Sequence, residues 1–136
     1  MVGVRTDASR RCDASLRATM LTIYAYRNCD TCRKALARLT ARGTAFTERA
    51  IREQPPSAAE LKRVLAAVGG DIRRLFNTSG QEYRALGMSA RLPGLDANAA
   101  IALLASNGNL CKRPIAIGPG IALVGFKPDE WSAAGL

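Results

Sequence analysis

The sequence predicts an α/β domain made of a strand–helix–strand unit, a mostly helical insert, and a strand hairpin followed by a last helix. Residues 21–26 (LTIYAY) combine β-branched and aromatic side chains, as is typical of a buried strand. The following segment has apolar residues at helical spacing instead. Strand-like runs return only after residue 112, so the two halves of the expected sheet are separated by helical sequence.

The first half of the chain is predicted to be a βαβ unit. One helical face has the i, i+3, i+4, i+7 spacing, with Cys32, Ala35, Leu36 and Leu39. Gly43 lies where this helix is expected to end. Residues 44–51 (TAFTERAI) alternate loosely and are predicted to form a second strand, connected to the first in the right-handed sense.

Residues 57–106 are predicted to form the helical insert. Ser57 and Glu60 have the spacing of a capping box at the start of a helix. Short helical segments are expected within residues 71–87, and a further helix is expected to begin near Asp96. The insert is followed by the predicted hairpin, with strands at 113–117 and 121–126, and by a helix that begins near Pro128.

The first 19 residues differ in composition from the rest of the chain. They are polar and arginine-rich, and they lack the apolar centre of a secretory signal. We expect residues 1–19 to be a disordered extension, with Met20 as an alternative start, and residues 20–136 to be one folded domain. The expected compartment is the cytoplasm, where structural disulfides are rare. No run of 18 apolar residues predicts a membrane-spanning helix.

The chain is strongly basic, with a formal net charge of +9 and 16 arginines against 4 lysines. This charge fits either an anionic partner or a solvated, arginine-rich surface. The arginines are scattered, and no aromatic residues are interleaved with them to stack on bases. Direct binding of nucleic acid is therefore not expected.

Cys29 and Cys32 form a Cys-x-x-Cys pair at the predicted start of the first helix. Unpaired backbone N–H groups at this position stabilise a thiolate and so lower the pKa of Cys29. The thiolate is the attacking species, and Cys32, one turn further along, can attack the resulting mixed disulfide. Arg33 adds positive charge nearby, and Asp30 opposes it. This pattern favours a redox or nucleophilic role.

Two alternatives to a redox pair remain open. A zinc site is disfavoured, because the chain has no histidine and its other cysteines are Cys12, in the extension, and Cys111. Two inert core thiols are the other alternative, since Cys32 lies on the apolar helical face. Cys111 itself is interpreted either as a buried small residue or as a third thiol within reach of Cys29.

Arg113-Pro114 stands at the entrance to the third predicted strand. X–Pro bonds are the ones that tolerate cis geometry, so Pro114 is either a cis proline or an ordinary edge-strand proline. The Arg113 guanidinium is able to hold an oxyanion or a carboxylate through two parallel hydrogen bonds. A solvated arginine at a strand end is the alternative.

Four segments resemble the arsenate reductase-like family that includes the Spx and MgsR redox regulators. They are IYAYRNCDTCRKAL (23–36), LFNTSGQEYR (75–84), NGNLCKRPI (107–115) and VGFKPDEW (124–131), in the family's order. The resemblance extends from residue 21 to about residue 132. It implies a thioredoxin-like fold with the helical insert between the βαβ half and the hairpin half, and a cis Pro114 facing the reactive cysteine.

The resemblance also implies roles for individual residues. We expect Cys29 and Cys32 to be the catalytic residues, and we expect the substrate to be bound by Arg113, Pro114, Asn28, Arg33 and Asn77. Two further anion-binding arginines of the family are absent here, with Asn77 at one position and Ala122 near the other. No metal and no bound cofactor are implied.

Two functions follow from this resemblance, and we favour the first. A thiol oxidoreductase would take electrons from glutathione, glutaredoxin or thioredoxin. Efficient arsenate reduction is not expected, because each missing guanidinium costs roughly 1.5–3 kcal/mol of charge-assisted hydrogen bonding. A regulator like Spx or MgsR would instead use the Cys-x-x-Cys pair as a disulfide switch and bind the α-subunit of RNA polymerase near Gly69-Gly70.

Overall fold

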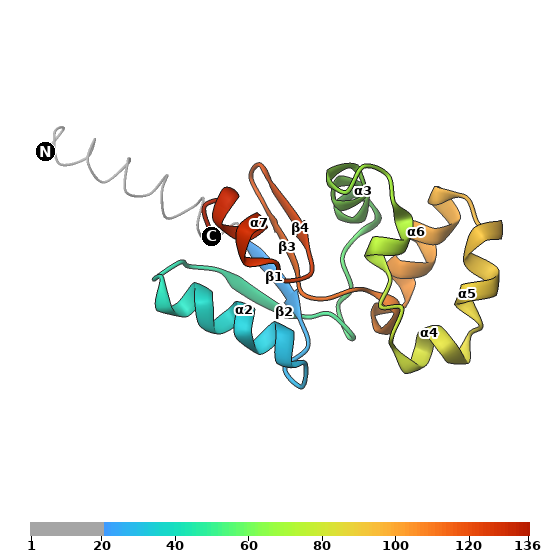
Figure 1. The fold of residues 1–136 in the computed structure, drawn as a ribbon, viewed down its shortest axis with the longest axis horizontal. Helices are drawn as coiled ribbons and strands as arrows, with labels where there is room; N and C mark the ends of the chain where they lie inside the picture. The colour runs from blue at the N-terminus through green and yellow to red at the C-terminus, as the bar shows by residue number, and fades with distance from the viewer. Residues whose placement is uncertain (1–20) are drawn as a thin grey trace, which may run out of the picture.

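The computed structural model describes residues 21–136, and the extension predicted at residues 1–19 lies outside this range. Four strands form one sheet in the order β2-β1-β3-β4 (Figure 1). The central strand β1 (Thr22–Ala25) pairs in parallel with β2 (Thr47–Ala50) and antiparallel with β3 (Ile115–Gly118). The hairpin of β3 and β4 (Ile121–Val124) completes the sheet. The predicted α/β fold is confirmed, although β2 is shorter than the predicted strand at 44–51.

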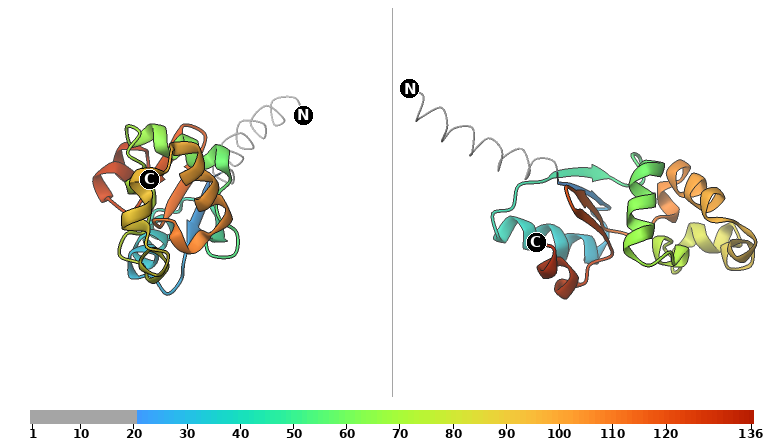
Figure 2. Two further views of the ribbon diagram at one scale, coloured as in Figure 1. Left: turned by 90° about the vertical axis from the view of Figure 1, so that its right-hand side faces the viewer. Right: turned by 90° about the horizontal axis from the view of Figure 1, so that it is seen from above.

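The two-residue period of the strands divides the core into two layers. Ile23 and Ala25 of β1 pack on one face of the sheet, against α2 (Asp30–Ala41) and α7 (Pro128–Ala133). Tyr24 points to the opposite face and packs among residues of the insert. Figures 1 and 2 show the same arrangement, with α2 and α7 on one side of the sheet and the insert on the other.

The insert connects β2 to β3 and consists of short helices. They are α3 (Ala58–Ala67), η1 (Ile72–Leu75), α4 (Gln81–Ala85), α5 (Met88–Arg91), η2 (Leu92–Gly94), α6 (Ala97–Ser106) and η3 (Gly108–Leu110), where η denotes a 3-10 helix. Their apolar side chains share one core with Tyr24, Ile115 and Val124 of the sheet. The insert is therefore packed onto the sheet rather than attached to it by a linker.

Side-chain caps fix the two longest helices of the insert where the sequence predicted them. The Ser57 hydroxyl accepts a hydrogen bond from the Glu60 backbone N–H at 3.2 Å, and Glu60 accepts one from the Ser57 N–H at 3.0 Å. Asp96 caps α6 by accepting a hydrogen bond from the Ala99 N–H at 2.7 Å. The helices α5 and η2 were not predicted, because 4 and 3 residues are too few to show a helical period.

The Arg113–Pro114 peptide bond is cis, which confirms one of the two predicted alternatives. The Pro114 carbonyl accepts a hydrogen bond from the Gly125 N–H at 2.8 Å, which links this bond to the end of β4.

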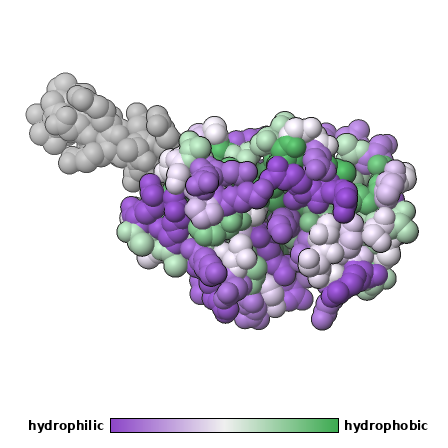
Figure 3. Space-filling model, viewed as in Figure 1, coloured by the Kyte–Doolittle hydropathy of each residue, from purple (hydrophilic) through white to green (hydrophobic). Residues whose placement is uncertain are grey.

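Hydrophilic side chains are spread over both halves of the face in Figure 3, and hydrophobic side chains form small separate areas there. Within residues 21–136, every helix is too short or too polar to cross a membrane.

Candidate functional site

Cys29 lies immediately before the first residue of α2, as the sequence predicted. Its backbone is extended, with φ −96° and ψ 122°. Its N–H donates to the Tyr26 carbonyl at 2.9 Å, and its own carbonyl accepts from the Arg33 N–H at 3.0 Å. The Cys29 side chain is half-buried at the mouth of the helix, so solvent reaches part of it.

Several groups act together on the pKa of Cys29. Burial acts to raise this pKa, but the opposing contributions outweigh it and the pKa is lowered. The largest of these come from the Cys32 backbone N–H and the Cys32 thiol, followed by the guanidinium of Arg113. A thiolate at Cys29 is thus stabilised both by the start of α2 and by a residue from the other half of the chain.

Cys32 has the opposite environment. It is fully buried on the α2 side of the sheet, and its sulfur accepts a hydrogen bond from the Tyr26 N–H at 3.5 Å. Burial is the main cause that raises the pKa of Cys32 from 9.0 to about 12. Cys32 is therefore a protonated thiol at neutral pH.

Cys111 is buried within the insert core, on the other face of the sheet. Its thiol donates to the Leu104 carbonyl at 3.6 Å, and its backbone forms a single β-bridge with Phe76. Burial raises the pKa of Cys111 to about 12. Cys29 packs against the opposite core, so the arrangement favours the interpretation of Cys111 as a buried small residue over that of a third reactive thiol.

Arg113 and Asn77 come together in a hollow of about 320 Å³. The same hollow contains Tyr26, Arg52 and Asn109, which sequence reasoning did not single out. The Cζ atoms of Arg113 and Arg52 are each 4.9 Å from the centre of the Tyr26 ring. No local pattern marked Arg52 or Tyr26, because their meeting depends on how the loops pack.

Asn28 supports this hollow through Tyr26. The Asn28 side-chain amide donates to the Tyr26 hydroxyl at 3.1 Å. This hydrogen bond is the largest contribution to the lowered pKa of Tyr26; burial opposes it, and the charges of Arg52 and Arg113 reinforce it. Asn28 is thus a neighbour of the cationic site.

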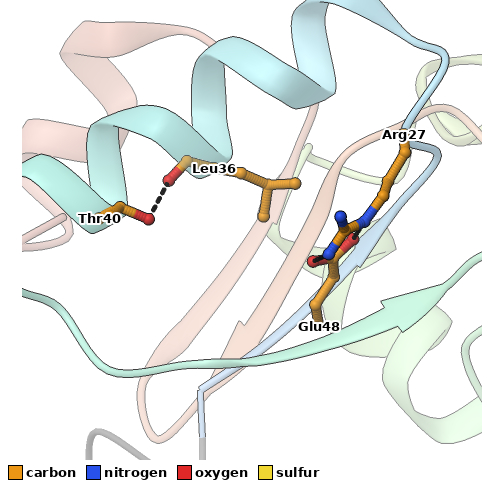
Figure 4. A network of polar contacts seen from close by, with 4 residues as sticks. All are labelled: Arg27, Leu36, Thr40 and Glu48. Atoms are coloured by element: carbon orange, nitrogen blue, oxygen red, sulfur yellow. Dashed lines mark hydrogen bonds and ion pairs between the residues drawn. The ribbon is translucent and has the colours of Figure 1, made fainter.

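Arg33 does not join this group. Its guanidinium pairs with Asp30 at 3.0 Å, and it lines a separate hollow beside Arg27 and Glu48. Arg27 donates to Glu48 through Nε at 3.0 Å and through a terminal nitrogen at 2.9 Å (Figure 4). This pair joins the residues just before Cys29 to β2.

A second, larger hollow of about 640 Å³ lies on the Thr31 side of the cysteine pair. Its cationic lining residues are Arg73, Arg74, Lys112 and Lys127, and Asp71 is the acidic residue among its lining. The surface beside the Cys-x-x-Cys turn is therefore cationic next to Thr31 as well as next to Arg113. Within residues 21–136, no three or more His, Cys, Asp or Glu side chains are grouped so that they could hold a metal ion.

The cis proline and the Cys-x-x-Cys turn, carried by this sheet, define a protein of the thioredoxin-like class. The model of the ArsC family matches residues 24–134, so the chain belongs to the ArsC family. The resemblance inferred from the sequence is thereby confirmed.

The relatives of this chain include a transcriptional regulator and a protein related to the ArsC family. YusI of Bacillus subtilis is 42% identical over 111 residues, which cover 82% of this chain and 94% of YusI. The global transcriptional regulator Spx of Enterococcus faecalis is 33% identical, covering 82% of this chain and 83% of Spx. The crystal structure of an ArsC-family-related protein from Bacteroides fragilis matches with a TM-score of 0.79 and 39% identity, covering 85% of this chain and 98% of that one.

Proposed function

We propose that this chain is a thiol-dependent reductase in which the Cys29 thiolate attacks a sulfur atom of an oxidised substrate. The observation that carries the proposal is the half-buried Cys29 at the start of α2, with its pKa lowered by Cys32 and Arg113. A thiolate that is both ionised and accessible is the species that reacts in thiol–disulfide exchange. The proposed compartment is the cytoplasm, whose thiols supply the electrons.

The proposed reaction has three exchange steps. First, the Cys29 sulfur bonds to one sulfur of a mixed disulfide, the original S–S bond breaks, and the second sulfur leaves as a thiolate. Next, a second thiol attacks the Cys29 sulfur, the remaining part of the substrate leaves as a thiolate, and the second thiol is now bonded to Cys29. A third thiol then attacks the sulfur of that second thiol, which frees the Cys29 thiolate. The two electrons come from the second and third thiols, which end as a disulfide.

An external thiol such as glutathione is the favoured second nucleophile. Cys32 is close to Cys29 in sequence, but it is fully buried and its pKa is raised to about 12. Little of it is therefore thiolate at neutral pH. Attack by Cys32 would give a Cys29–Cys32 disulfide, which glutathione, glutaredoxin or thioredoxin would then reduce.

Free arsenate is a less favoured substrate for this site. Asn77 lies in the hollow with Arg113, where the family's arsenate reductases carry an arginine, and it offers neutral donors only. Ala122, on β4, has no donor in its side chain. A substrate with one anionic group and a reactive sulfur fits these side chains better.

The test is reduction of a glutathione mixed disulfide by the purified chain with glutathione as the reductant, measured above the uncatalysed rate. We expect Cys29→Ser to abolish turnover and Cys32→Ser to keep most of it when glutathione is the reductant. Full activity in Cys29→Ser would remove Cys29 from the reaction. Loss of activity in Cys32→Ser would instead assign the second step to Cys32.

A regulatory function is the second candidate, and the Spx relative together with the Cys-x-x-Cys pair favours it. In this case oxidation to a Cys29–Cys32 disulfide would alter a surface that binds the α-subunit of RNA polymerase. Gly69 and Gly70, which follow α3 with φ of 69° and 84°, belong to the proposed contact region. Capture of the polymerase α-subunit by the purified chain, through the carboxy-terminal domain of that subunit and in a manner that depends on the redox state, would support the regulator over the enzyme.

A further inference from the structure

Arg52 is a second arginine in the hollow that contains Arg113 and Tyr26. Each guanidinium carbon is 4.9 Å from the centre of the Tyr26 ring, within the about 6 Å at which a cation is attracted to an aromatic face. Arg52 comes from the turn after β2, and Arg113 comes from the segment before β3. One half-buried ring thus joins two cations that are far apart in the sequence.

These two guanidiniums are not neutralised by neighbouring carboxylates. Within residues 21–136, neither arginine forms an ion pair. The acidic side chain that lines the hollow is Glu82, and it accepts a hydrogen bond from the Asn107 amide at 2.9 Å. Two like charges beside one ring repel each other, and a bound anion relieves that repulsion. The hollow therefore has the chemistry of an anion site.

Arg52 is held in place at its backbone and at its side chain. Its Nε–H donates to the Asn109 side-chain oxygen at 2.6 Å. A Cβ atom on Gly108 would overlap the Ile51 carbonyl and lie 2.9 Å from the Arg52 Cα, so the loop packs directly on the glycine. The Ile51 N–H also donates to the Ala25 carbonyl at 3.0 Å. A side chain positioned in this way loses less conformational entropy on binding than a free surface arginine.

The hollow is connected to Cys29 through Arg113, whose guanidinium lies over the Tyr26 ring and also lowers the pKa of Cys29. We propose that Arg52 and Arg113 together bind an anionic group, a carboxylate or a tetrahedral oxyanion, of the molecule that reacts with Cys29. Arg52 then supplies a positive charge that Asn77 and Ala122 do not. The proposal rests on the proposed function for the identity of the reacting molecule, and on the geometry of the hollow for the anion site.

Alkylation of Cys29 by two reagents that differ in charge tests the site without turnover. Iodoacetate carries a carboxylate, and iodoacetamide is its neutral counterpart, so the ratio of their rates reports attraction of an anion to Cys29. We expect Arg52→Gln to lower this ratio about 3- to 10-fold, as for the loss of one positive charge beside a solvent-exposed anion. Arg52→Lys is expected to give an intermediate ratio, because lysine keeps the charge but lacks the planar fork.

Arg42→Gln is the matched control. Arg42 is exposed at the far end of α2, and its replacement changes the net charge by the same amount. The proposal is overturned if Arg52→Gln leaves the ratio unchanged, or if Arg42→Gln lowers it equally. Thermal unfolding of each variant shows whether the fold is retained.

Binding measurements with two unreactive probes identify the source of the anion. Sulfate represents a free oxyanion, and S-methylglutathione represents a carboxylate-bearing thiol; each is titrated by calorimetry into wild type and Arg52→Gln. Weaker binding of either probe to the variant supports the site and assigns its class, whereas unchanged binding of both contradicts it. A chain that binds these probes through Arg52 but reduces no disulfide would retain the anion site and reject the reductase function.

Discussion

The two faces of the sheet each bury a cysteine, yet only the α2 face also carries a cysteine suited to react. Cys32 on the α2 face and Cys111 on the insert face are both fully buried, and burial raises the pKa of each to about 12. Cys29 differs because Cys32 and Arg113 lower its pKa and because its side chain is only half-buried. Burial alone therefore makes Cys32 and Cys111 unreactive, whereas Cys32 and Arg113, which come from the two halves of the chain, favour the thiolate of Cys29.

The largest expected effect is the difference in alkylation rate among these three thiols. At neutral pH, native protein treated with iodoacetamide should be modified at Cys29 more than about 100-fold faster than at Cys32 or Cys111, since of these three thiols Cys29 is the accessible one with a lowered pKa. Peptide mapping by mass spectrometry gives the three rates. Modification of Cys32 before Cys29 would reverse the assignment of the nucleophile.

Gly108→Ala tests how tightly the insert is packed against the βαβ half. The new Cβ would overlap the Ile51 carbonyl, so we expect a loss of about 3 kcal/mol in the free energy of unfolding, as for other overpacked sites. Urea denaturation measures this loss. Gly94→Ala is the control, because nothing lies within 4 Å of a Cβ at that position. Equal stability of the two variants would show that the contact at Gly108 is looser than described.

Arg113→Gln separates the effect of Arg113 on the pKa of Cys29 from the effect of the start of α2 on the same pKa. Without the guanidinium, the pKa of Cys29 should rise, so the rate of alkylation should fall about tenfold at neutral pH. The rate plotted against pH should shift to higher pH, with an unchanged plateau where Cys29 is fully ionised. A profile that superimposes on that of wild type would leave α2 and Cys32 as the sole causes of the lowered pKa.

The smallest effect concerns stability at alkaline pH. A thiol with a pKa of 9.0 when unfolded and about 12 when buried stabilises the fold below pH 9, and this contribution is lost as pH rises from 9 toward 12. The slope for one such group is at most about 1.4 kcal/mol per pH unit. Cys111→Ala should therefore make the decline in urea midpoint between pH 9 and 10.5 less steep. The lowered pKa of Cys29 acts in the opposite sense, because its contribution increases with pH up to about 9.

The local features of the site were predictable because they depend on neighbouring residues. The apolar spacing after Cys29 defines α2, and the Ser57–Glu60 capping box defines the start of α3. The proline after Arg113 indicated a cis bond as one of two alternatives, and the resemblance to the ArsC family favoured that alternative. The role of Arg33 stays a prediction that the arrangement does not favour, since Asp30 occupies its guanidinium.

By itself, the sequence determined the order of the strands and of the longer helices, the starts of α2, α3 and α6, and the placement of Cys29, since periodicity and capping act over a few neighbouring residues. Only the tertiary structure decided that Cys32 and Cys111 lie on opposite faces of the sheet and that Arg52 and Arg113 meet at Tyr26. The physical reason is that these contacts depend on how the insert packs on the sheet and on the close approach at Gly108. The residue pattern within a single segment cannot predict the close approach of Gly108 to Ile51.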